Sequence, residues 1–203
     1  MATRFRKFYE SCSEQQKGKI KVVFSDDEQN SYLSNILKKD RIDFVQYNYN
    51  CVQENRNLAL SNALLKQLEK NKVDYCFSFG SHILKGDILK KYENRLINFH
   101  PSLLPMYPGK NAIDQAVLDK KSLLVGNTAH FIDSGIDTGN IIMQSVMTIE
   151  AFYKGSYDAI LDVQVKMLNK LISAIDDDRL KLIDGKPFIE EADYTAYHIY
   201  PNF

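Results

Sequence analysis

The feature that most constrains the fold is a repeated alternation of short β-rich runs with segments of helical period. Residues 20–24, 44–49 and 73–79 are predicted strands. The segments between them carry apolar residues at helical spacing with polar residues opposite. Strands that alternate with covering helices are typical of a parallel sheet. The pattern predicts an α/β fold in three layers, built on a doubly wound, mostly parallel sheet of Rossmann-like type.

The second half of the chain continues the pattern with three more predicted strands, at residues 96–99, 125–131 and 141–146. The last two are close enough in sequence to pair as antiparallel neighbours, so we expect a mixed sheet. From Tyr157 to the acidic run at residues 176–178, the apolar residues keep helical spacing. This stretch predicts a long helix that packs on the core.

The beginning of the chain departs from this pattern. Phe5, Phe8, Tyr9 and Cys12 form a helical stripe that starts almost at the first residue, with no predicted strand before it. A doubly wound sheet ordinarily starts with a strand, so we expect this fold to lack the usual first one. Because no repeat or Pro/Gly-rich linker divides the chain, a single domain over residues 1–203 is predicted.

Charge and cysteine content narrow the classes of partner. Lys+Arg and Asp+Glu both total 26, so no basic field attracts nucleic acid or an anionic membrane. The apolar runs are strand-sized and no signal-peptide stretch is present, which predicts a cytoplasmic protein. Cys12, Cys51 and Cys76 are odd in number and widely spaced, so we expect neither a disulfide framework nor a metal site.

A proline-rich loop follows the predicted strand at residues 96–99. Three of the five prolines of the chain lie within Pro101–Pro108. Open α/β sheets bind ligands beyond the carboxyl ends of their strands. Period-two alternation places Asn98 and His100 on one side of the strand and Phe99 on the other. An amide and an imidazole therefore point at one place, although a purely structural hydrogen-bonded pair fits these two residues equally well.

A second polar segment follows the predicted strand at residues 125–131. It reads His-Phe-Ile-Asp-Ser-Gly-Ile-Asp-Thr-Gly over residues 130–139, and its glycines permit a tight path that brings a carboxylate close to a ligand. An Asp beside a His can fix the tautomer of the imidazole and favour its charged form. Taken alone, the segment is more typical of an ordinary Asp/Gly hairpin loop.

Together these two segments resemble the folate-dependent formyltransferases, and among them the phosphoribosylglycinamide formyltransferases. The resemblance is carried by Asn98-x-His100-Pro-Ser-Leu-Leu-Pro and by Asp133-x-Gly-x-Asp137-Thr-Gly. It implies transfer of a formyl group from the co-substrate 10-formyltetrahydrofolate to a small-molecule primary amine, without a metal. It also implies that Asn98, His100 and Asp137 are the catalytic residues, whereas Asp133 shapes its loop.

The resemblance further implies two sets of binding residues. The folate pocket would be formed by His82, Ile83, Leu84, Ile132, Asp133, Gly135 and Ile136. The acceptor would contact Pro101, Ser102, Gly109 and Gln164. His82 stands where the family commonly has Arg, so it is equally well explained as a surface histidine.

Two departures from the family leave the acceptor open. The Gly-Ser-Asn-type turn that holds a phosphate in the family is missing, and Arg4, Arg6 and Lys7 stand beside its place. These charges fit either a solvated helix end or attraction of a phosphate. The family has an acidic residue where this chain has Gln164. Glycinamide ribonucleotide is ranked first as the acceptor.

Three alternatives to this acceptor remain. They are N-formylation of a nucleotide-linked amino-deoxysugar, folate binding without turnover, and deformylation of formyltetrahydrofolate. The sequence leaves the oligomeric state, including a homodimer, open.

Overall fold

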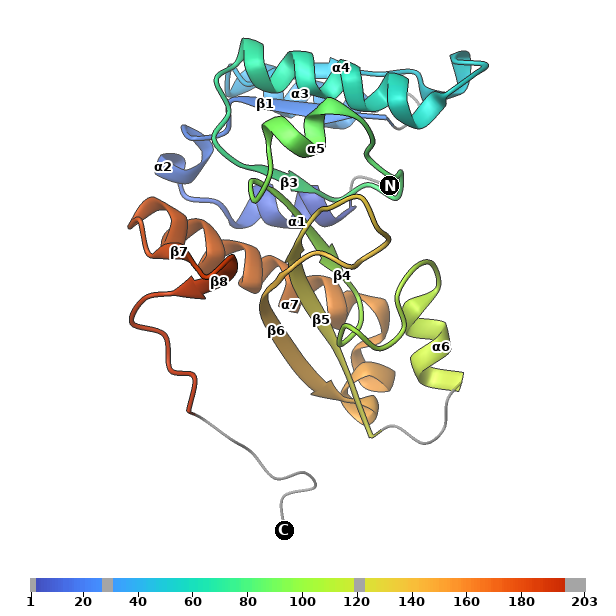
Figure 1. Ribbon diagram of the computed structural model, residues 1–203, viewed down its shortest axis with the longest axis vertical. Helices are drawn as coiled ribbons and strands as arrows, with labels where there is room; N and C mark the ends of the chain where they lie inside the picture. Colours follow the sequence, from blue (N-terminus) through green and yellow to red (C-terminus); the bar gives the residue numbers. More distant parts are fainter. Residues whose placement is uncertain (1–2, 27–30, 119–122, 196–203) are drawn as a thin grey trace.

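The strands fall into three sheets (Figure 1). The computed structural model describes residues 3–26, 31–118 and 123–195. A two-stranded sheet contains β1 (Val22–Ser25) and β2 (Asp43–Gln46). The largest sheet has the order β3 (Cys76–Ser78), β4 (Leu96–His100), β5 (Leu124–Phe131) and β6 (Ile141–Thr148). A third sheet is the hairpin of β7 (Leu180–Ile183) and β8 (Lys186–Ile189).

The pairing within these sheets is mixed. β1 pairs with β2 and β3 pairs with β4 in parallel, whereas β4–β5 and β5–β6 are antiparallel. All six strands expected from the sequence form, and the antiparallel pairing of β5 with β6 is confirmed. The antiparallel pairing of β4 with β5 was not predicted, and it matters for the site because it places residues of β5 directly beside β4.

The hairpin β7–β8 was also not predicted, although the chain carries a signal for it. Its two strands are joined by Asp184 and Gly185 alone. Both residues have positive φ, at 51° and 75°. This is the backbone of a tight two-residue hairpin turn, for which Asp-Gly is a favoured sequence.

Helices cover both faces of the sheets. α1 (Thr3–Ser11), α3 (Ser31–Lys39) and α7 (Ile149–Asp176) pack on one face, and α4 (Arg56–Lys70) and α5 (Asp87–Lys91) pack on the other. Short helical segments complete the described part: α2 (Glu14–Lys17), η1 (Tyr49–Cys51) and α6 (Ala112–Leu118). The predicted three-layer arrangement is therefore confirmed.

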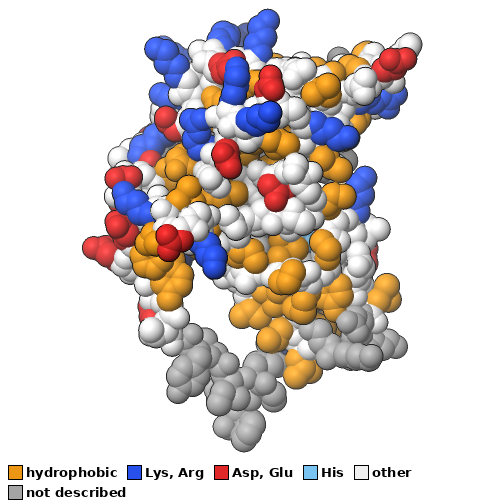
Figure 2. Space-filling view, in the orientation of Figure 1, with side chains coloured by type: hydrophobic (Ala, Val, Ile, Leu, Met, Phe, Trp, Pro, Cys, Tyr) orange, Lys and Arg blue, Asp and Glu red, His pale blue; other side chains and the backbone are white. Residues whose placement is uncertain are grey.

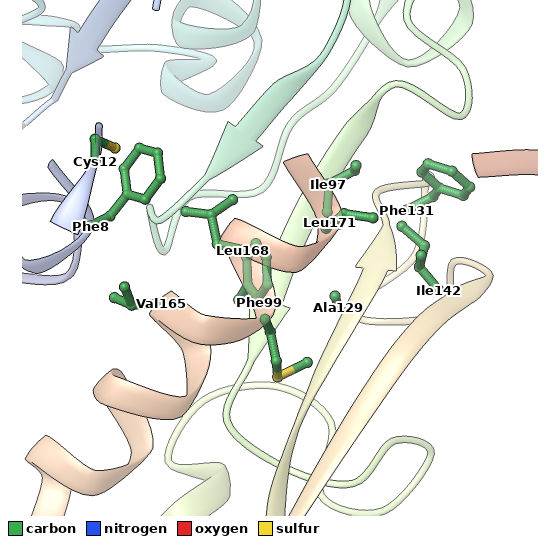
Figure 3. Close-up of a cluster of buried hydrophobic side chains, with 11 residues drawn as sticks. Phe8, Cys12, Ile97, Phe99, Ala129, Phe131, Ile142, Val165, Leu168 and Leu171 are labelled. Carbon is green, nitrogen blue, oxygen red and sulfur yellow. The ribbon is translucent and has the colours of Figure 1, made fainter. Parts of the chain in front are cut away.

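The largest hydrophobic cluster lies between the four-stranded sheet and the helices α1 and α7 (Figure 3). Ile97 and Phe99 of β4 point toward Leu168 and Leu171 of α7. Leu96, the neighbour of Ile97 on β4, packs on the opposite side with α4 and α5. Alternation along β4 thus gives each helical layer its own set of apolar side chains.

The two parallel strand pairs do not join into one sheet. Among the described strands, β1 pairs only with β2, and β3 pairs only with β4. A cavity of about 1570 Å³ is lined by residues of both β1 and β3 and reaches the carboxyl end of β4. Within the described residues the first element is α1, and no strand lies between β1 and β3.

The surface carries both charge signs (Figure 2). On the face shown, Lys and Arg lie among Asp and Glu over the upper helices, and hydrophobic side chains gather lower down. Exposed apolar residues at the end formed by α6, β5 and β6 include Leu118, Leu123 and Val146. Within the described ranges, every helix is too short or too polar to span a lipid bilayer.

The packing of α7 on the sheet gives a first prediction. Leu171 is 0% exposed, so Leu171→Ala should lower the free energy of unfolding by about 2–5 kcal/mol through lost burial and the cavity left behind. Leu118, which is 74% exposed, is the matched control, and Leu118→Ala should change stability by less than about 0.5 kcal/mol. Urea unfolding measures both, and equal effects would contradict this account of the core.

Candidate active site

The strand β4 delivers two polar side chains to its carboxyl end. Asn98 and His100 alternate with Ile97 and Phe99, whose side chains are taken up by the core. The sequence prediction that Asn98 and His100 share one face of the strand, opposite Phe99, agrees with this arrangement. Pro101 ends the strand by removing a backbone donor, and the chain turns into a loop.

His100 is buried and held at both ring nitrogens. Its Nδ1 lies 3.2 Å from Oδ2 of Asp137, and its Nε2 donates to the carbonyl oxygen of Tyr107 at 2.8 Å. A carboxylate and a carbonyl oxygen both accept hydrogen bonds. The surroundings of His100 therefore favour an imidazole with both nitrogens protonated.

Asp137 connects the two loops of the site. It lies in the connection between β5 and β6, with a positive φ of 54°, and its Oδ2 accepts the backbone N–H of Gly109 at 2.8 Å. Burial alone would raise the pKa of Asp137. The hydrogen bond with His130, the Gly109 N–H and the charges of the two histidines outweigh it, so the pKa lies below its ordinary value.

His130 is the residue that sequence reasoning missed. It is 2% exposed, and its Nε2 lies 3.3 Å from Nδ2 of Asn98 and 3.5 Å from Oδ1 of Asp137. Its Nδ1 donates to the carbonyl oxygen of Phe131 at 2.8 Å. His130 thus lies against both Asn98 and Asp137, and its Nε2 can accept from Asn98 when the ring is neutral or donate to Asp137 when the ring is protonated. The sequence does show that His130 begins the second polar segment. Its position opposite Asn98, however, follows only from the antiparallel pairing of β4 with β5.

The loop after β4 is held in shape by buried hydroxyl groups. Ser102 is 2% exposed, and its Oγ donates to the carbonyl oxygens of Met106 at 2.7 Å and Tyr107 at 3.2 Å. Thr128 of β5 donates to the carbonyl oxygen of Ser102 at 2.7 Å. Gly109 has a φ of 83°, a left-handed conformation that favours glycine. These contacts fix the Gly109 N–H against Asp137.

Most of the residues predicted for the site line a single cavity. Asn98, His100 and Asp137 line it. So do Pro101, Gly109, His82, Ile83, Leu84, Ile132, Asp133, Gly135 and Ile136. Ser102 does not line it, because its hydroxyl is used within its own loop. Gln164 does not line it either, since it is 1% exposed on α7 and neither of its amide atoms has a partner among the described residues.

The segments expected to bind folate form an apolar part of this cavity. Leu84 is buried with α4 and α5, Ile132 packs against the same cluster, and Ile83 and Ile136 are exposed. Asp133 accepts the N–H of Gly135 at 2.9 Å and so shapes its own loop.

His82 has neighbours of its own at the edge of the cavity. Its ring stacks on Tyr49 with ring centroids 3.7 Å apart, and its Nε2 lies 3.5 Å from Oδ2 of Asp26. In the described part of the chain, no group of three or more His, Cys, Asp or Glu residues is arranged to hold a metal ion.

Comparison with known proteins gives a family match over most of the chain. The family model described as "Formyl transferase" matches residues 1–170. Phosphoribosylglycinamide formyltransferase of Bacillus subtilis (strain 168) is 39% identical over 93 residues, which are 45% of this chain and 47% of that protein. The match thus spans about half the length of this curated relative.

Solved structures match over a larger part of the chain. Glycinamide ribonucleotide transformylase 1 from Symbiobacterium toebii superposes with a TM-score of 0.74 and 26% identity, covering 93% of this chain and 89% of that one. Phosphoribosylglycinamide formyltransferase from Anaplasma phagocytophilum gives a TM-score of 0.72 at 23% identity, covering 95% and 91%. The predicted α/β fold is confirmed by both.

The lowered pKa of Asp137 gives a second prediction. A carboxylate whose pKa is lower in the folded than in the unfolded state stabilises the fold fully above the unfolded value of about 3.9, and this contribution is lost as the pH falls through the folded value. Between about pH 6 and pH 3, the free energy of unfolding should therefore fall more steeply in the unmodified protein than in Asp137→Asn.

Urea unfolding at a series of pH values measures this difference. Glu54 is an exposed carboxylate in a loop away from the site, so Glu54→Gln should leave the pH dependence of stability unchanged. Parallel pH profiles for the unmodified protein and Asp137→Asn would show that Asp137 is not held as described.

Proposed function

The chain belongs to the formyl transferase family, and from this premise we propose that it transfers the formyl group of 10-formyltetrahydrofolate to a primary amine of a phosphorylated small molecule, with glycinamide ribonucleotide as the acceptor. The observation that carries the proposal is the convergence of Asn98, His100 and Asp137. An amide, an imidazole and a carboxylate from two distant segments meet at one end of one cavity.

Formyl transfer requires the residue types that are found at this end of the cavity. When an amine attacks a formyl carbon, negative charge develops on the formyl oxygen. The transition state is stabilised by donors already in place. The side-chain amide of Asn98 is such a donor, and it lines the cavity with His100. The Nε2 of His100 donates to the Tyr107 carbonyl oxygen in this structure, so it would serve the formyl oxygen by exchanging that hydrogen bond for one to the substrate. The contact between Asn98 and His130 restricts the orientation of the amide before substrate binds.

Protons must also leave the attacking amine and reach the departing folate nitrogen. We assign this exchange to His100, directly or through water, because an imidazole can both accept and donate a proton. Asp137 orients the His100 ring and stabilises its charged form through the 3.2 Å contact with Nδ1. The Gly109 N–H and His130 in turn hold Asp137 ionised.

The folate would lie against the apolar part of the cavity. Ile83, Leu84, Ile132 and Ile136 supply a surface that suits a flat heteroaromatic ring, and the backbone beside Gly135 supplies polar groups. We include His82 and Asp133 in this set as residues at the rim.

On the acceptor side, Pro101 and Gly109 line the cavity beside His100. Ser102 fixes the loop that carries Pro101 and Gly109, and we propose this supporting role for it instead of contact with the acceptor. Gln164 lies on α7 between Leu161 and Leu168, both of which line the cavity. Its amide is buried and does not reach the cavity, so we do not include Gln164 among the residues that contact the acceptor.

An acceptor assay tests the proposed reaction directly. Purified protein with 10-formyltetrahydrofolate should release tetrahydrofolate, followed by absorbance, when glycinamide ribonucleotide is added. Turnover only with aminodeoxysugar nucleotides would show that these, and not glycinamide ribonucleotide, are the acceptors. Release of tetrahydrofolate without any acceptor would indicate a deformylase. Folate binding without turnover under all conditions would refute the enzymatic proposal.

Substitutions at the convergent residues test the mechanism. Asn98→Ala and His100→Ala should each lower turnover by about 10²-fold or more, because each removes a donor to the developing negative charge. Far-UV circular dichroism should show unchanged folding. Asn35 is an exposed amide on α3, so Asn35→Ala is the control and should retain full activity. Full activity in Asn98→Ala and His100→Ala would remove the proposed site.

A further inference from the structure

The strands β1 and β3 each have one edge that pairs with no other described strand. Figure 1 shows β1 lying apart from β3. The two strands run in the same direction. After them, Nε2 of His82 lies 3.5 Å from Oδ2 of Asp26. Before them, Ile20 and Tyr75 pack against the same hydrophobic cluster. Two parallel strands therefore border one cavity with an edge that is not used for pairing in the described part of the chain.

The backbone of both strands presents hydrogen-bonding groups at these edges. In a parallel pair, the N–H and C=O groups of alternate residues point to the same neighbouring strand. The C=O of Ser25 accepts from the segment after β2 at 2.7 Å, and the N–H of Cys76 donates to the segment before β4 at 2.9 Å. The backbone groups of Phe24 and Phe77, one residue away, therefore point in the opposite direction, toward the cavity.

Apolar side chains close the same space on both faces of the sheet. One set comes from α4 and the other from α1 and α7, which cover opposite faces. The residues that line the space are Leu60, Leu64 and Leu68 of α4, and Phe5, Phe8 and Leu168 of α1 and α7. We call the part of the cavity that is bounded by β1, β3 and these six residues the strand slot.

The size and surroundings of the cavity suit an extended polypeptide. Its volume of about 1570 Å³ exceeds the roughly 300–1,000 Å³ of pockets for small molecules. The residues assigned to formyl transfer lie at the carboxyl ends of the strands, so they account for one end of the cavity only. Backbone groups along two sides and apolar walls on two faces are the surroundings of a central strand in a parallel sheet.

We propose that the strand slot binds an extended aliphatic segment of a partner polypeptide, which runs parallel to β1 and β3 and hydrogen-bonds with both. Strands buried on both faces are rich in Val, Ile and Leu, which defines the chemistry of the segment. At a rise of about 3.3 Å per residue, about five residues would extend along residues 20–25 and 75–79. Backbone hydrogen bonds supply the affinity when a peptide adds to a strand edge.

A synthetic peptide, acetyl-Lys-Val-Ile-Val-Ile-Val-Lys-amide, tests the binding with the full chain. Calorimetry should show binding with a negative change in heat capacity, and the melting temperature of the protein should rise. Hydrogen exchange at the amides of Phe24 and Phe77 should slow about 10-fold or more. The amide of Cys76, which already donates to a neighbouring segment, should change less. None of these measurements requires formyl transfer, so they can fail independently of the proposed function.

N-methylation of the peptide distinguishes insertion between two strands from addition to a single edge such as that of β6. In an inserted strand, alternate N–H groups donate to β1 and to β3. Methylation of either alternate set should therefore weaken binding about 10-fold or more. A peptide that adds to a single edge uses only one of the two sets. Sensitivity to one set alone, or to neither, would overturn the inference.

Leu64→Gln tests the place of binding against Leu58→Gln, a matched change on the same helix outside the strand slot. Leu64→Gln should weaken peptide binding about 10-fold, because it replaces an apolar contact with an amide, and Leu58→Gln should leave binding unchanged. Val22→Pro is a second variant. It removes an N–H that points to the slot, at the first residue of a strand, where proline is tolerated. Far-UV circular dichroism checks folding of each variant.

Two outcomes contradict the location. One is failure of the unmodified protein to bind the unmethylated peptide. The other is equal binding by the unmodified protein and by whichever of Leu64→Gln and Val22→Pro is folded.

Discussion

The site depends on one carboxylate shared by two loops. Asp137 accepts the Gly109 N–H at 2.8 Å and lies 3.2 Å from His100 and 3.5 Å from His130. Without the Asp137 carboxylate, the hydrogen bond that joins the loop after β4 to the loop after β5 would be lost. The imidazoles of His100 and His130 would also lose their nearby negative charge. The positive φ of 54° at Asp137 is accepted because the Gly109 N–H and the His100 ring hold the side chain in place.

The hydrophobic core makes this polar arrangement possible by fixing β4 from both sides. Leu96 packs with α4 and α5, whereas Ile97 and Phe99 pack with α1 and α7. A one-residue shift of β4 would turn Asn98 and His100 into an apolar layer, where their polar groups would lose their partners. The burial of Ile97 and Phe99 therefore determines which way the amide and the imidazole point.

The alternation of residues was enough to predict which side chains share a face of one strand, but not which strands pair with each other. The shared face of Asn98 and His100 followed from period two, and the six strands followed from apolar runs. His130 was missed because its position beside Asn98 depends on antiparallel pairing across a long connection. The burial of Gln164 and the internal use of the Ser102 hydroxyl also arise from tertiary packing, which residue spacing does not report.

The helix α1 packs in both halves of the molecule. Phe8 and Cys12 belong to the cluster of the four-stranded sheet, and Tyr9 belongs to the cluster of β1, β2 and α3. Because β1 and β3 do not pair, the relative position of the two sheets depends on this helix more than on strand hydrogen bonds. Arg4 lies in the first turn of α1, and its Nη1 lies 3.4 Å from the carbonyl oxygen of Phe99, so α1 also contacts the strand that carries Asn98 and His100.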